Sequence, residues 1–358
     1  MAEARGRRVV VAMSGGVDSS VAAALLVDAG YDVVGVSMQL YDASHGDERF
    51  GSCCTIDDLH DARRVAHALG IPHYIVNLGR RFEAVVVANF VREYAGGRTP
   101  IPCAHCNSEL KFSTLVEQAA GFEADRVATG HYARVTRDAG GVYHLFRGID
   151  DGKDQAYFLF ALTQAQLARA MFPVGGMQKD DVRRAAVARG LRVADKPDSQ
   201  EICFVPAGAY STVVDRYLPA DRSGLVIDGQ GRVLGRHDGV HHFTVGQRKG
   251  LGISAREPLY VVKLDAERRL VQLGPRAALD RLSLTASGVN WVSGSPPGGE
   301  IRAEVQIRSR HAAAAARVTP IGADRLAVEF DAPQSAVSPG QAAVVFQGDE
   351  VFGGGWID

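Results

Sequence analysis

A run of serines and glycines near the N-terminus has the composition of a phosphate-binding loop. It reads SGGVDSS over residues 14–20, directly after a short apolar run and directly before a helical pattern. Glycine lets a backbone approach a ligand closely, and the free N–H groups of a first helical turn attract phosphate oxygens. Asp18 could cap that helix or hold a magnesium ion. Neither GxxxxGKS/T nor GxGxxG occurs, so the run predicts neither a P-loop NTPase nor a dinucleotide enzyme.

Cysteines form the second set of reactive side chains. There are five of them, Cys53, Cys54, Cys103, Cys106 and Cys203. An odd number argues against a disulfide framework, and we expect a cytoplasmic protein in which some thiols are reactive. The polar, non-periodic surroundings of Cys106 and Cys203 favour loops and reactive thiols, whereas structural thiols are expected at Cys53 and Cys54.

Cys103 and Cys106 also form a CxxC pair, and with Cys203 they could hold three corners of a 4Fe–4S cluster. A zinc site is less favoured, because no second CxxC or HxxxH pair accompanies them.

The elements that must position these residues change character along the chain. Strand-like apolar runs at 8–13, 32–38, 73–78 and 126–129 alternate with helical patterns that begin at 17 and cover 57–69, 82–94 and 111–121. This alternation predicts an α/β fold with a Rossmann-like parallel sheet over residues 1–207. Short strand patterns with glycine-rich turns predict a small β-rich domain at 208–276 and a β-barrel at 277–358.

Composition sets limits on the partners. The chain has 358 residues, 46% hydrophobic and 23% charged, with 40 Lys and Arg against 41 Asp and Glu. It is therefore globular, without a global basic field, and an RNA partner would have to be held by local clusters such as 236–256 and 302–311. The first apolar run is too short to span a membrane, so no membrane partner is expected.

The motifs together are similar to one enzyme family. The 14–20 run resembles the pyrophosphate loop of N-type ATP pyrophosphatases. Further motifs lie at 97–112, 128–134, 152–159, 198–206 and 241–253, and the chain closes with SPGQAAVVF and GGGWI. In that order and spacing they resemble the bacterial tRNA-specific 2-thiouridylases over essentially the whole chain.

The resemblance implies a reaction and its active site. Members are sulfurtransferases that use ATP and Mg²⁺ to adenylate O2 of the wobble uridine in the tRNAs for Lys, Glu and Gln. Sulfur then replaces that oxygen, and AMP and pyrophosphate are released. Cys203 would receive the persulfide, and Cys106 would form a disulfide with it as the product leaves. The implied ATP-site residues are Ala12, Met13, Ser14, Gly15, Gly16, Val17, Asp18, Ser19, Met38 and Gly130.

The resemblance also implies partners. The expected tRNA contacts are Ile101, Pro102, Cys103, His131, Lys153, Asp154, Gln155, Arg308, Ser309 and Gln341. A cysteine desulfurase or a sulfur carrier would supply the sulfur to a monomeric enzyme. The best-known members have Asp where this chain has Cys103, which leaves open whether a persulfide relay or an iron–sulfur cluster delivers the sulfur.

Two other functions remain open on the residues alone. One is an N-type pyrophosphatase that amidates a small carboxylate or a nucleotide, although no glutaminase-like segment is present to supply ammonia. The other is a non-enzymatic RNA-binding or iron–sulfur sensor protein, which would keep the loop and the CxxC pair but would not need Cys203.

Overall fold

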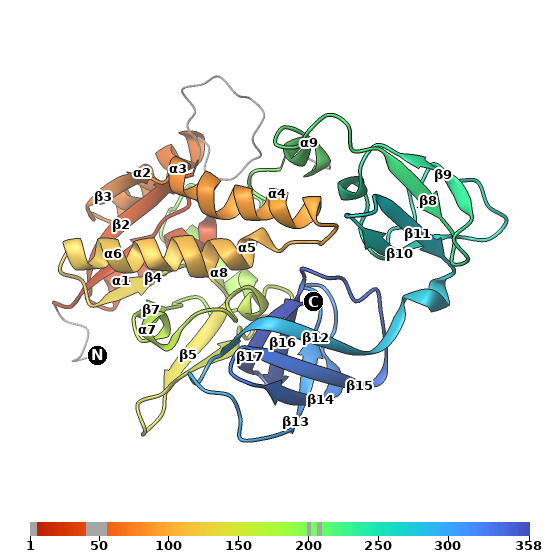
Figure 1. Ribbon diagram of the computed structural model, residues 1–358. Helices are drawn as coiled ribbons and strands as arrows, with labels where there is room; N and C mark the ends of the chain where they lie inside the picture. Colours follow the sequence, from red (N-terminus) through yellow and green to blue (C-terminus); the bar gives the residue numbers. More distant parts are fainter. Residues whose placement is uncertain (1–5, 41–55, 199–201, 206–209) are drawn as a thin grey trace.

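The computed structural model describes residues 6–40, 56–198, 202–205 and 210–358, and Figure 1 shows them as an α/β unit, a small β unit and a β-barrel. This architecture confirms the predicted fold class. In the α/β unit, the described strands form a parallel sheet in the order β3-β2-β1-β4-β7. Their bounds are Arg8–Ala12 (β1), Asp32–Gln39 (β2), His73–Asn77 (β3), Arg126–Ala128 (β4) and Ala170–Met171 (β7).

The central strand β1 explains the start of the chain. Its Val9, Val10 and Val11 are fully buried, as expected for a parallel strand that helices cover on both faces. The helices of this unit are α1 (Val17–Asp28), α2 (Ile56–Ala68), α6 (Phe112–Gly121), α7 (Gln164–Leu167) and α8 (Lys179–Ala188). Because α1 follows β1 after only four residues, the phosphate loop lies at the carboxyl end of the central strand.

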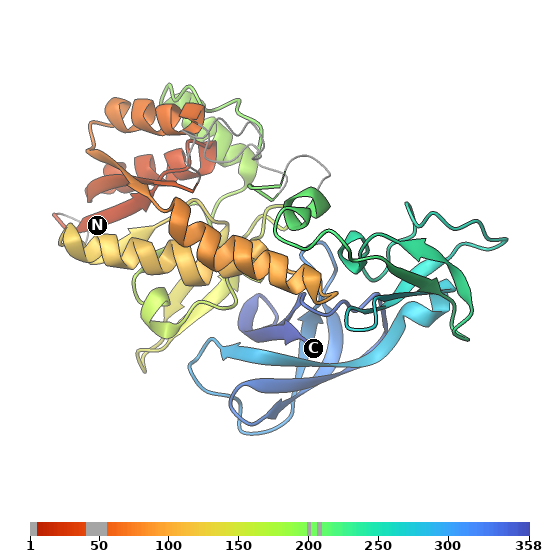
Figure 2. The ribbon, with the colours of Figure 1, turned by 45° about the horizontal axis from the view of Figure 1, so that its top comes forward.

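Two longer helical stretches contain π-helical turns. The first combines α3 (Gly79–Phe82), the π turn η2 (Glu83–Val87) and α4 (Ala88–Ala95). The second begins with α5 (Pro102–His105) and the π turn η3 (Cys106–Lys111) and continues into α6. Such π turns are frequent at functional sites. Figures 1 and 2 show α4 running from the α/β unit towards the place where the three units meet.

The small β unit has its own sheet and core. Its strands are β8 (Gly224–Ile227), β9 (Val233–His237), β10 (Tyr260–Asp265) and β11 (Leu270–Gly274), ordered β10-β11-β8-β9. Two short helical elements accompany them, α9 (Tyr210–Asp215) before the sheet and the 3₁₀ turn η5 (Val240–His242). The core contains Val226, Phe243, Val261 and Val271.

The C-terminal barrel is closed. Around it the strands follow the order β12-β15-β14-β13-β16-β17, and β12 also pairs with β17. Closure leaves no unpaired edge in the barrel. The 3₁₀ turn η6 (Arg276–Leu279) leads into β12 (Asp280–Trp291), β13 (Ile301–Gln306), β14 (Ala314–Ile321), β15 (Arg325–Ser335), β16 (Ala342–Gln347) and β17 (Glu350–Ile357).

A hairpin that the sequence did not predict connects the barrel to the α/β unit. Strands β5 (Ala133–Arg137) and β6 (Tyr143–Arg147) follow the parallel strand β4, but β6 pairs with β17 of the barrel. The 3₁₀ turn η4 (Ala156–Phe158) lies beyond the hairpin. Tyr157 and Phe160 belong to one hydrophobic core with Val344 and Phe346 of the barrel. The α/β unit and the barrel therefore share a core.

Candidate active site

The phosphate loop is shaped by glycine and by the start of α2. Gly15 has a φ of +77°, and a Cβ atom there would lie 2.1 Å from the carbonyl oxygen of Asp58. Only glycine fits such a position. Gly16 is the N-cap of α1 and makes no side-chain cap hydrogen bond, so an anion can take that place at the helix N-terminus.

The serine hydroxyls stabilise the loop itself. The Ser14 amide donates to Oγ of Ser19 at 3.2 Å, and Oγ of Ser20 donates to the Gly16 carbonyl at 2.8 Å. Ser14 is exposed, whereas Val17 and Ser19 are buried. The loop is therefore built before any ligand arrives, with Ser14 on its open side.

Asp18 binds side chains and does not cap the helix. Its carboxylate accepts hydrogen bonds from the Tyr132 hydroxyl at 2.8 Å and from Lys179 Nζ at 2.8 and 2.9 Å. Burial, reinforced by the Asp18 charge, raises the pKa of Tyr132, so the phenol keeps its proton and donates. Of the two roles considered for Asp18, the capping role is wrong, because the carboxylate turns to these partners instead.

Lys179 extends this contact into an ion-pair network. Its Nζ atom also lies 2.8 Å from Asp198, which contacts Lys153 at 2.6 Å and Arg183 at 3.2 Å. Burial by itself raises the pKa of Asp198, but hydrogen bonds from Lys153 and Lys179 outweigh it and hold that pKa below its ordinary value. Asp198 is therefore ionised at neutral pH.

A second lysine holds the loop against α2. Lys196 Nζ lies 3.1 Å from the Gly15 carbonyl oxygen, 2.6 Å from Asp58 and 2.7 Å from Asp61. Both network residues, Lys196 and Asp198, come shortly before Cys203 in the chain. Lys196 thus contacts the phosphate loop directly, and Asp198 is connected to it through Lys179.

The remaining expected ATP-site residues lie at strand ends. Ala12 and Met38 are partly exposed near the carboxyl ends of β1 and β2. Met13 is buried, so only its backbone is available to a ligand. A Cβ at Gly130 would lie 2.6 Å from the Ser19 amide nitrogen, so glycine permits the segment after β4 to contact the start of α1. These positions surround one edge of the sheet.

The cysteines differ strongly in exposure. Cys103 is exposed on α5, Cys106 is 4% exposed, Cys203 is intermediate, and no disulfide joins any two of these three cysteines. Cys106 and Cys203 pack in the same hydrophobic cluster as Phe82 and Phe204. Burial raises the pKa of Cys106 to about 11, and Cys203 lies near enough to add to this rise. Cys53 and Cys54 lie outside the described residues.

The expected loop position of Cys106 is wrong. Pro102 occupies the first turn of α5, where its missing N–H costs nothing, and Cys106 opens the π turn η3. Leu110, four residues further on, is buried beside Cys106, whereas Glu109 is exposed. Two of the polar residues that suggested a loop, Asn107 and Ser108, are buried in this helical stretch and donate hydrogen bonds to the Phe158 and Ala104 carbonyl oxygens.

The barrel holds the segment before these thiols. The Thr99 amide donates to the Pro339 carbonyl at 2.7 Å, and Gln341 Nε2 donates to the Thr99 carbonyl at 3.0 Å. The His105 ring stacks on Trp356 at 4.2 Å, with 3° between the planes. Ile101 and Pro102 are buried in this segment, and Cys103 is exposed.

Other expected tRNA contacts have partners within the protein. Asp154 accepts a hydrogen bond from Arg147, and Gln155 accepts one from the Tyr132 amide. Arg308 donates to the Ser335 carbonyl, whereas Ser309 is exposed. Lys153 keeps a 34% exposed side chain. Their contacts with RNA stay predictions.

His131 is packed beside the site. Its Nδ1 atom lies 2.8 Å from the Thr129 hydroxyl, and its ring lies 6.3 Å from those of both Phe112 and Phe172. Burial lowers the pKa of His131 to about 3, and the Lys111 charge acts in the same direction. The imidazole is therefore neutral at physiological pH and can offer only a neutral hydrogen-bonding group to a ligand.

Part of the basic cluster at 236–256 is not on the surface. Arg236, Arg248, Lys249 and Arg256 are exposed, but His237, His241 and Phe243 are buried in the small β unit. Phe243, which lies among these cations in the sequence, fills the core of that unit and offers no aromatic surface to a ligand.

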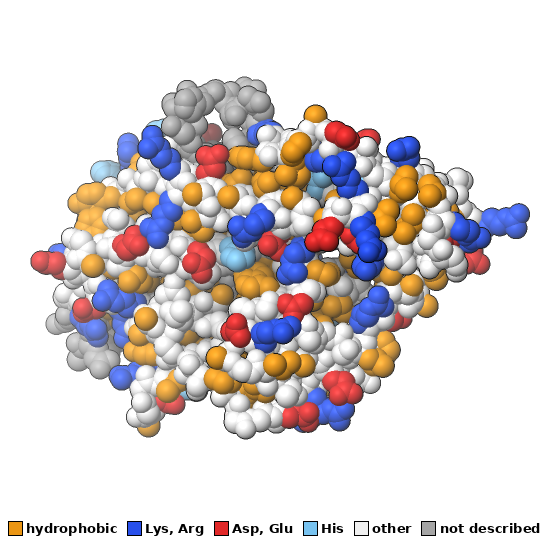
Figure 3. All heavy atoms as spheres, viewed as in Figure 1, with side chains coloured by type: hydrophobic (Ala, Val, Ile, Leu, Met, Phe, Trp, Pro, Cys, Tyr) orange, Lys and Arg blue, Asp and Glu red, His pale blue; other side chains and the backbone are white. Residues whose placement is uncertain are grey.

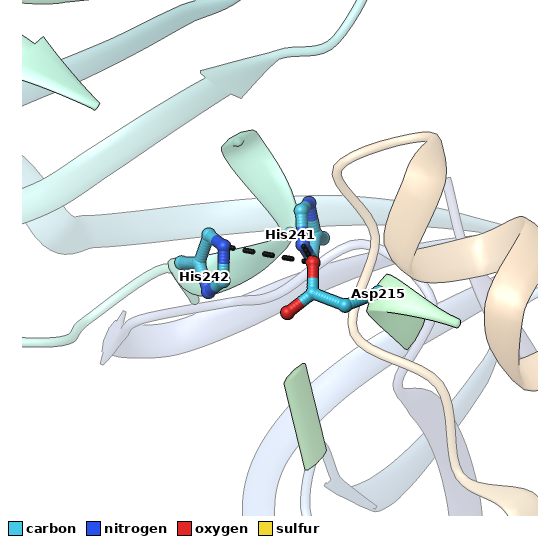
Figure 4. Close-up of side chains that lie close together, drawn as sticks. All are labelled: Asp215, His241 and His242. Atoms are coloured by element: carbon cyan, nitrogen blue, oxygen red, sulfur yellow. Dashed lines mark hydrogen bonds and ion pairs between the residues drawn. The ribbon is translucent and has the colours of Figure 1, made fainter. Parts of the chain in front are cut away.

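Asp215, His241 and His242 bring three possible metal-ligand atoms within 4.8 Å of one another, the one such group among the described residues (Figure 4). A cation is already present, however. Arg222 lies 2.9 Å from the Asp215 carboxylate and 3.4 Å from Nε2 of His241, which itself lies 2.9 Å from Asp215. The group is an ion-paired joint between α9 and η5.

The sequence analysis missed several residues of the site. Tyr132 and Asp198 lie within motifs that were recognised, so their positions carried a signal. Lys179 and Lys196 carried none, because a lysine beside acidic residues usually lies on a solvated helix face. Their contacts with Asp18 and Gly15 depend on the tertiary fold.

Known proteins match the chain along its length. A family described as "tRNA methyl transferase HUP domain" matches residues 7–207. Families described as "tRNA methyl transferase PRC-barrel domain" and "Aminomethyltransferase beta-barrel domain" match 211–275 and 281–357.

Curated relatives bear the name tRNA-specific 2-thiouridylase MnmA. The one from Geotalea uraniireducens is 51% identical, over 98% of this chain and 95% of its own. The one from Geobacter metallireducens is 50% identical, over 100% and 98%. The one from Solibacter usitatus is 52% identical, over 98% and 99%. The chain belongs to the tRNA-specific 2-thiouridylase family.

Membership in the 2-thiouridylase family confirms the resemblance seen in the motifs. It is also consistent with an ATP-using α/β unit whose phosphate loop follows the central strand. None of the helices in the described ranges has the length and apolar character that crossing a membrane requires.

Proposed function

We propose that this protein is a cytoplasmic, monomeric tRNA sulfurtransferase that uses ATP to replace O2 of the wobble uridine by sulfur in the tRNAs for Lys, Glu and Gln. The observation that carries the proposal is the structural link between the phosphate loop, where ATP would bind, and the cysteines that would deliver sulfur. Asp198, five residues before Cys203, is bound through Lys179 to Asp18 of the phosphate loop. Met38, an expected ATP-site residue, and Cys203 both pack against the hydrophobic cluster that contains Cys106. These contacts support a site in which the thiols lie beside ATP.

The first step activates the oxygen. An amide-like carbonyl oxygen is a poor leaving group, so O2 attacks the α-phosphorus of ATP and pyrophosphate departs. The N-terminus of α1, with Gly16 as its cap, offers N–H groups to phosphate oxygens. Mg²⁺ would neutralise charge on the phosphates, and the Asp18 carboxylate would hold it after giving up part of its contact with Lys179, which reaches both carboxylate oxygens.

The second step delivers sulfur. A cysteine desulfurase or sulfur carrier places a persulfide on Cys203, whose terminal sulfur attacks C2 while the C–O bond breaks and AMP leaves. Cys106 then attacks the Cys203 sulfur, so a disulfide forms and the new sulfur stays on the base. A thiol reductant must reduce that disulfide before the next turnover. The shared cluster of Cys106 and Cys203 supports this pairing.

The same three thiols could instead hold an iron–sulfur cluster. Cys103 and Cys106 lie one helical turn apart, Cys203 lies near Cys106, and thiolates are the ordinary ligands of iron–sulfur clusters. When bound at Cys103, Cys106 and Cys203, a 4Fe–4S cluster would offer one open iron to a sulfide. Cys103 distinguishes the two mechanisms of sulfur delivery, because the cluster would need its thiolate whereas the persulfide relay uses only Cys106 and Cys203.

Two assays test the function. Unmodified tRNA should stimulate AMP and pyrophosphate release by the wild type, and 2-thiouridine should form when a persulfide donor is added. Cys203→Ser should keep pyrophosphate release and lose 2-thiouridine. ATP cleavage that does not respond to unmodified tRNA would contradict the proposal.

The route is tested on anaerobically purified wild type and Cys103→Ser. Loss of iron and activity together in the variant supports the cluster. Full activity of iron-free wild type with a persulfide donor supports the relay.

A further inference from the structure

An unbroken series of ion pairs joins Lys153 to the phosphate loop. Lys153 Nζ lies 2.6 Å from one carboxylate oxygen of Asp198, and the other oxygen lies 2.8 Å from Lys179 Nζ. Lys179 in turn contacts both carboxylate oxygens of Asp18. One end of the series is an expected tRNA contact, and the other is the residue expected to serve Mg²⁺ and ATP.

The series is partly shielded from water. Lys179 is only 8% exposed, and the Asp198 side chain is 20% exposed. Charge interactions in such surroundings are screened less than those at the surface. A change of charge at one ion pair therefore alters the strength of the next ion pair in the series. Lys153, with the most exposed side chain of the four residues, is the end that a phosphate can reach.

The Lys179 ammonium group forms hydrogen bonds or ion pairs with two carboxylates at once. An ammonium group has three protons, and three carboxylate oxygens surround Nζ, two from Asp18 and one from Asp198. A tRNA phosphate that binds Lys153 competes with Asp198 for that cation. Asp198 then attracts Lys179 more strongly, and Asp18 becomes freer to accept Mg²⁺ with ATP. The expected coupling is thus positive.

We propose that Asp198 is a positioning residue that couples tRNA binding at Lys153 to ATP binding at Asp18. The inference rests on the proposed function, because it takes tRNA and ATP as the two ligands. Binding free energies are reciprocal, so ATP must tighten tRNA binding by the same factor.

The test measures the dissociation constant of a non-hydrolysable ATP analogue with Mg²⁺, with and without saturating unmodified tRNA. We expect tRNA to tighten analogue binding to the wild type about fivefold or more, the lower end of typical coupling. Asp198→Asn removes the charge from the middle of the series and should reduce the factor to about one. Lys153→Met breaks the surface end and should do the same, even if Asp198→Asn fails to fold.

Arg183→Met is the matched control. Arg183 also contacts Asp198, at 3.2 Å, but it does not lie between Lys153 and Asp18. This variant should keep the wild-type coupling factor between tRNA and the ATP analogue. If substitutions near Asp198 lowered the factor merely by weakening the site in general, Arg183→Met would lower it too. Equal coupling in wild type and Lys153→Met, or no coupling in the wild type, would overturn the proposal.

The same preparation is assayed for 2-thiouridine. If 2-thiouridine forms but tRNA does not tighten binding of the ATP analogue, only this inference is contradicted. Absence of product contradicts the proposed function, while the coupling factor, a binding measurement, still decides the role of Asp198.

Discussion

Burial suppresses ionisation of the Cys106 thiol. The pKa of about 11 for Cys106 leaves on the order of one thiol in ten thousand ionised at neutral pH. In the proposed relay, this proton must therefore be lost to another group, or the surroundings of Cys106 must open, before Cys106 attacks Cys203. Such suppression would keep Cys106 inert until a persulfide is in place.

This state of Cys106 predicts a pH profile. In the native protein, iodoacetamide should label exposed Cys103 at neutral pH, while the labelling rate of Cys106 should keep rising with pH towards about 11. Mass spectrometry of the labelled peptides measures both. In urea, Cys106 should titrate like an ordinary thiol. A native profile for Cys106 that levels off below pH 9 would contradict the burial argument.

The two loop glycines are not equivalent. A Cβ at Gly15 would meet the Asp58 carbonyl oxygen at 2.1 Å and would sit at a positive φ, whereas a Cβ at Gly16 meets its nearest neighbour, the Ser14 hydroxyl, at 3.5 Å. We expect Gly15→Ala to lower the free energy of unfolding by more than about 1 kcal/mol and Gly16→Ala to change it far less. Chemical denaturation of the pair measures the difference, and equal losses would count against this loop geometry.

At the scale of elements, the barrel positions α5, which contains Cys103 and is followed directly by Cys106. Strand β17 and the turn before β16 contact residues 98–105 through Pro339, Gln341, Ile357 and Trp356. His105 lies between the two cysteines of the CxxC pair, and its stack on Trp356 fixes the orientation of α5. A misplacement of about 1 Å in a reacting group can cost a hundredfold in rate.

His105 variants test this positioning. His105→Ala should slow 2-thiouridine formation about tenfold, because α5 loses its stack while the phosphate loop is untouched. Pyrophosphate release should stay near the wild-type rate. His105→Phe keeps a planar ring and should restore most of the lost thiolation. If alanine slows both reactions equally, or if phenylalanine restores nothing, the stack does not position the thiols.

The parallel sheet and its loop were predictable because local signals agree there. Val9, Val10 and Val11 indicate a buried strand, and SGGVDSS indicates the turn into α1. The β5–β6 hairpin was not predictable, since Leu145 pairs with Val351, about two hundred positions away. The helical position of Cys106 was not predictable, because the polar Asn107 and Ser108 beside it are buried through hydrogen bonds to Phe158 and Ala104, and the sequence does not show those partners.

At the scale of the whole molecule, charge is balanced and mixed. Figure 3 shows basic and acidic side chains interspersed on one face, in keeping with the net charge of −1. Several cations are already paired, such as Arg302 with Asp331 and Lys153 with Asp198. An RNA phosphate must therefore compete with carboxylates on the protein, and such competition makes contacts selective for a ligand that offers several phosphates at once.

The shared core makes two of the three units depend on each other. Phe160 is fully buried among residues of both the α/β unit and the barrel, whereas Phe243 packs within the small β unit.

Removing a buried phenyl ring typically costs 3–5 kcal/mol. Phe160→Ala should therefore speed amide hydrogen exchange in β1 and β4 and also in β16 and β17. Phe243→Ala should speed exchange in β8, β10 and β11 and leave those four strands protected. Exchange measured by mass spectrometry under native conditions distinguishes the two patterns, because local opening follows the cooperative unit that the substitution weakens. If Phe160→Ala exposed the barrel strands alone, the two units would unfold independently despite the core they share.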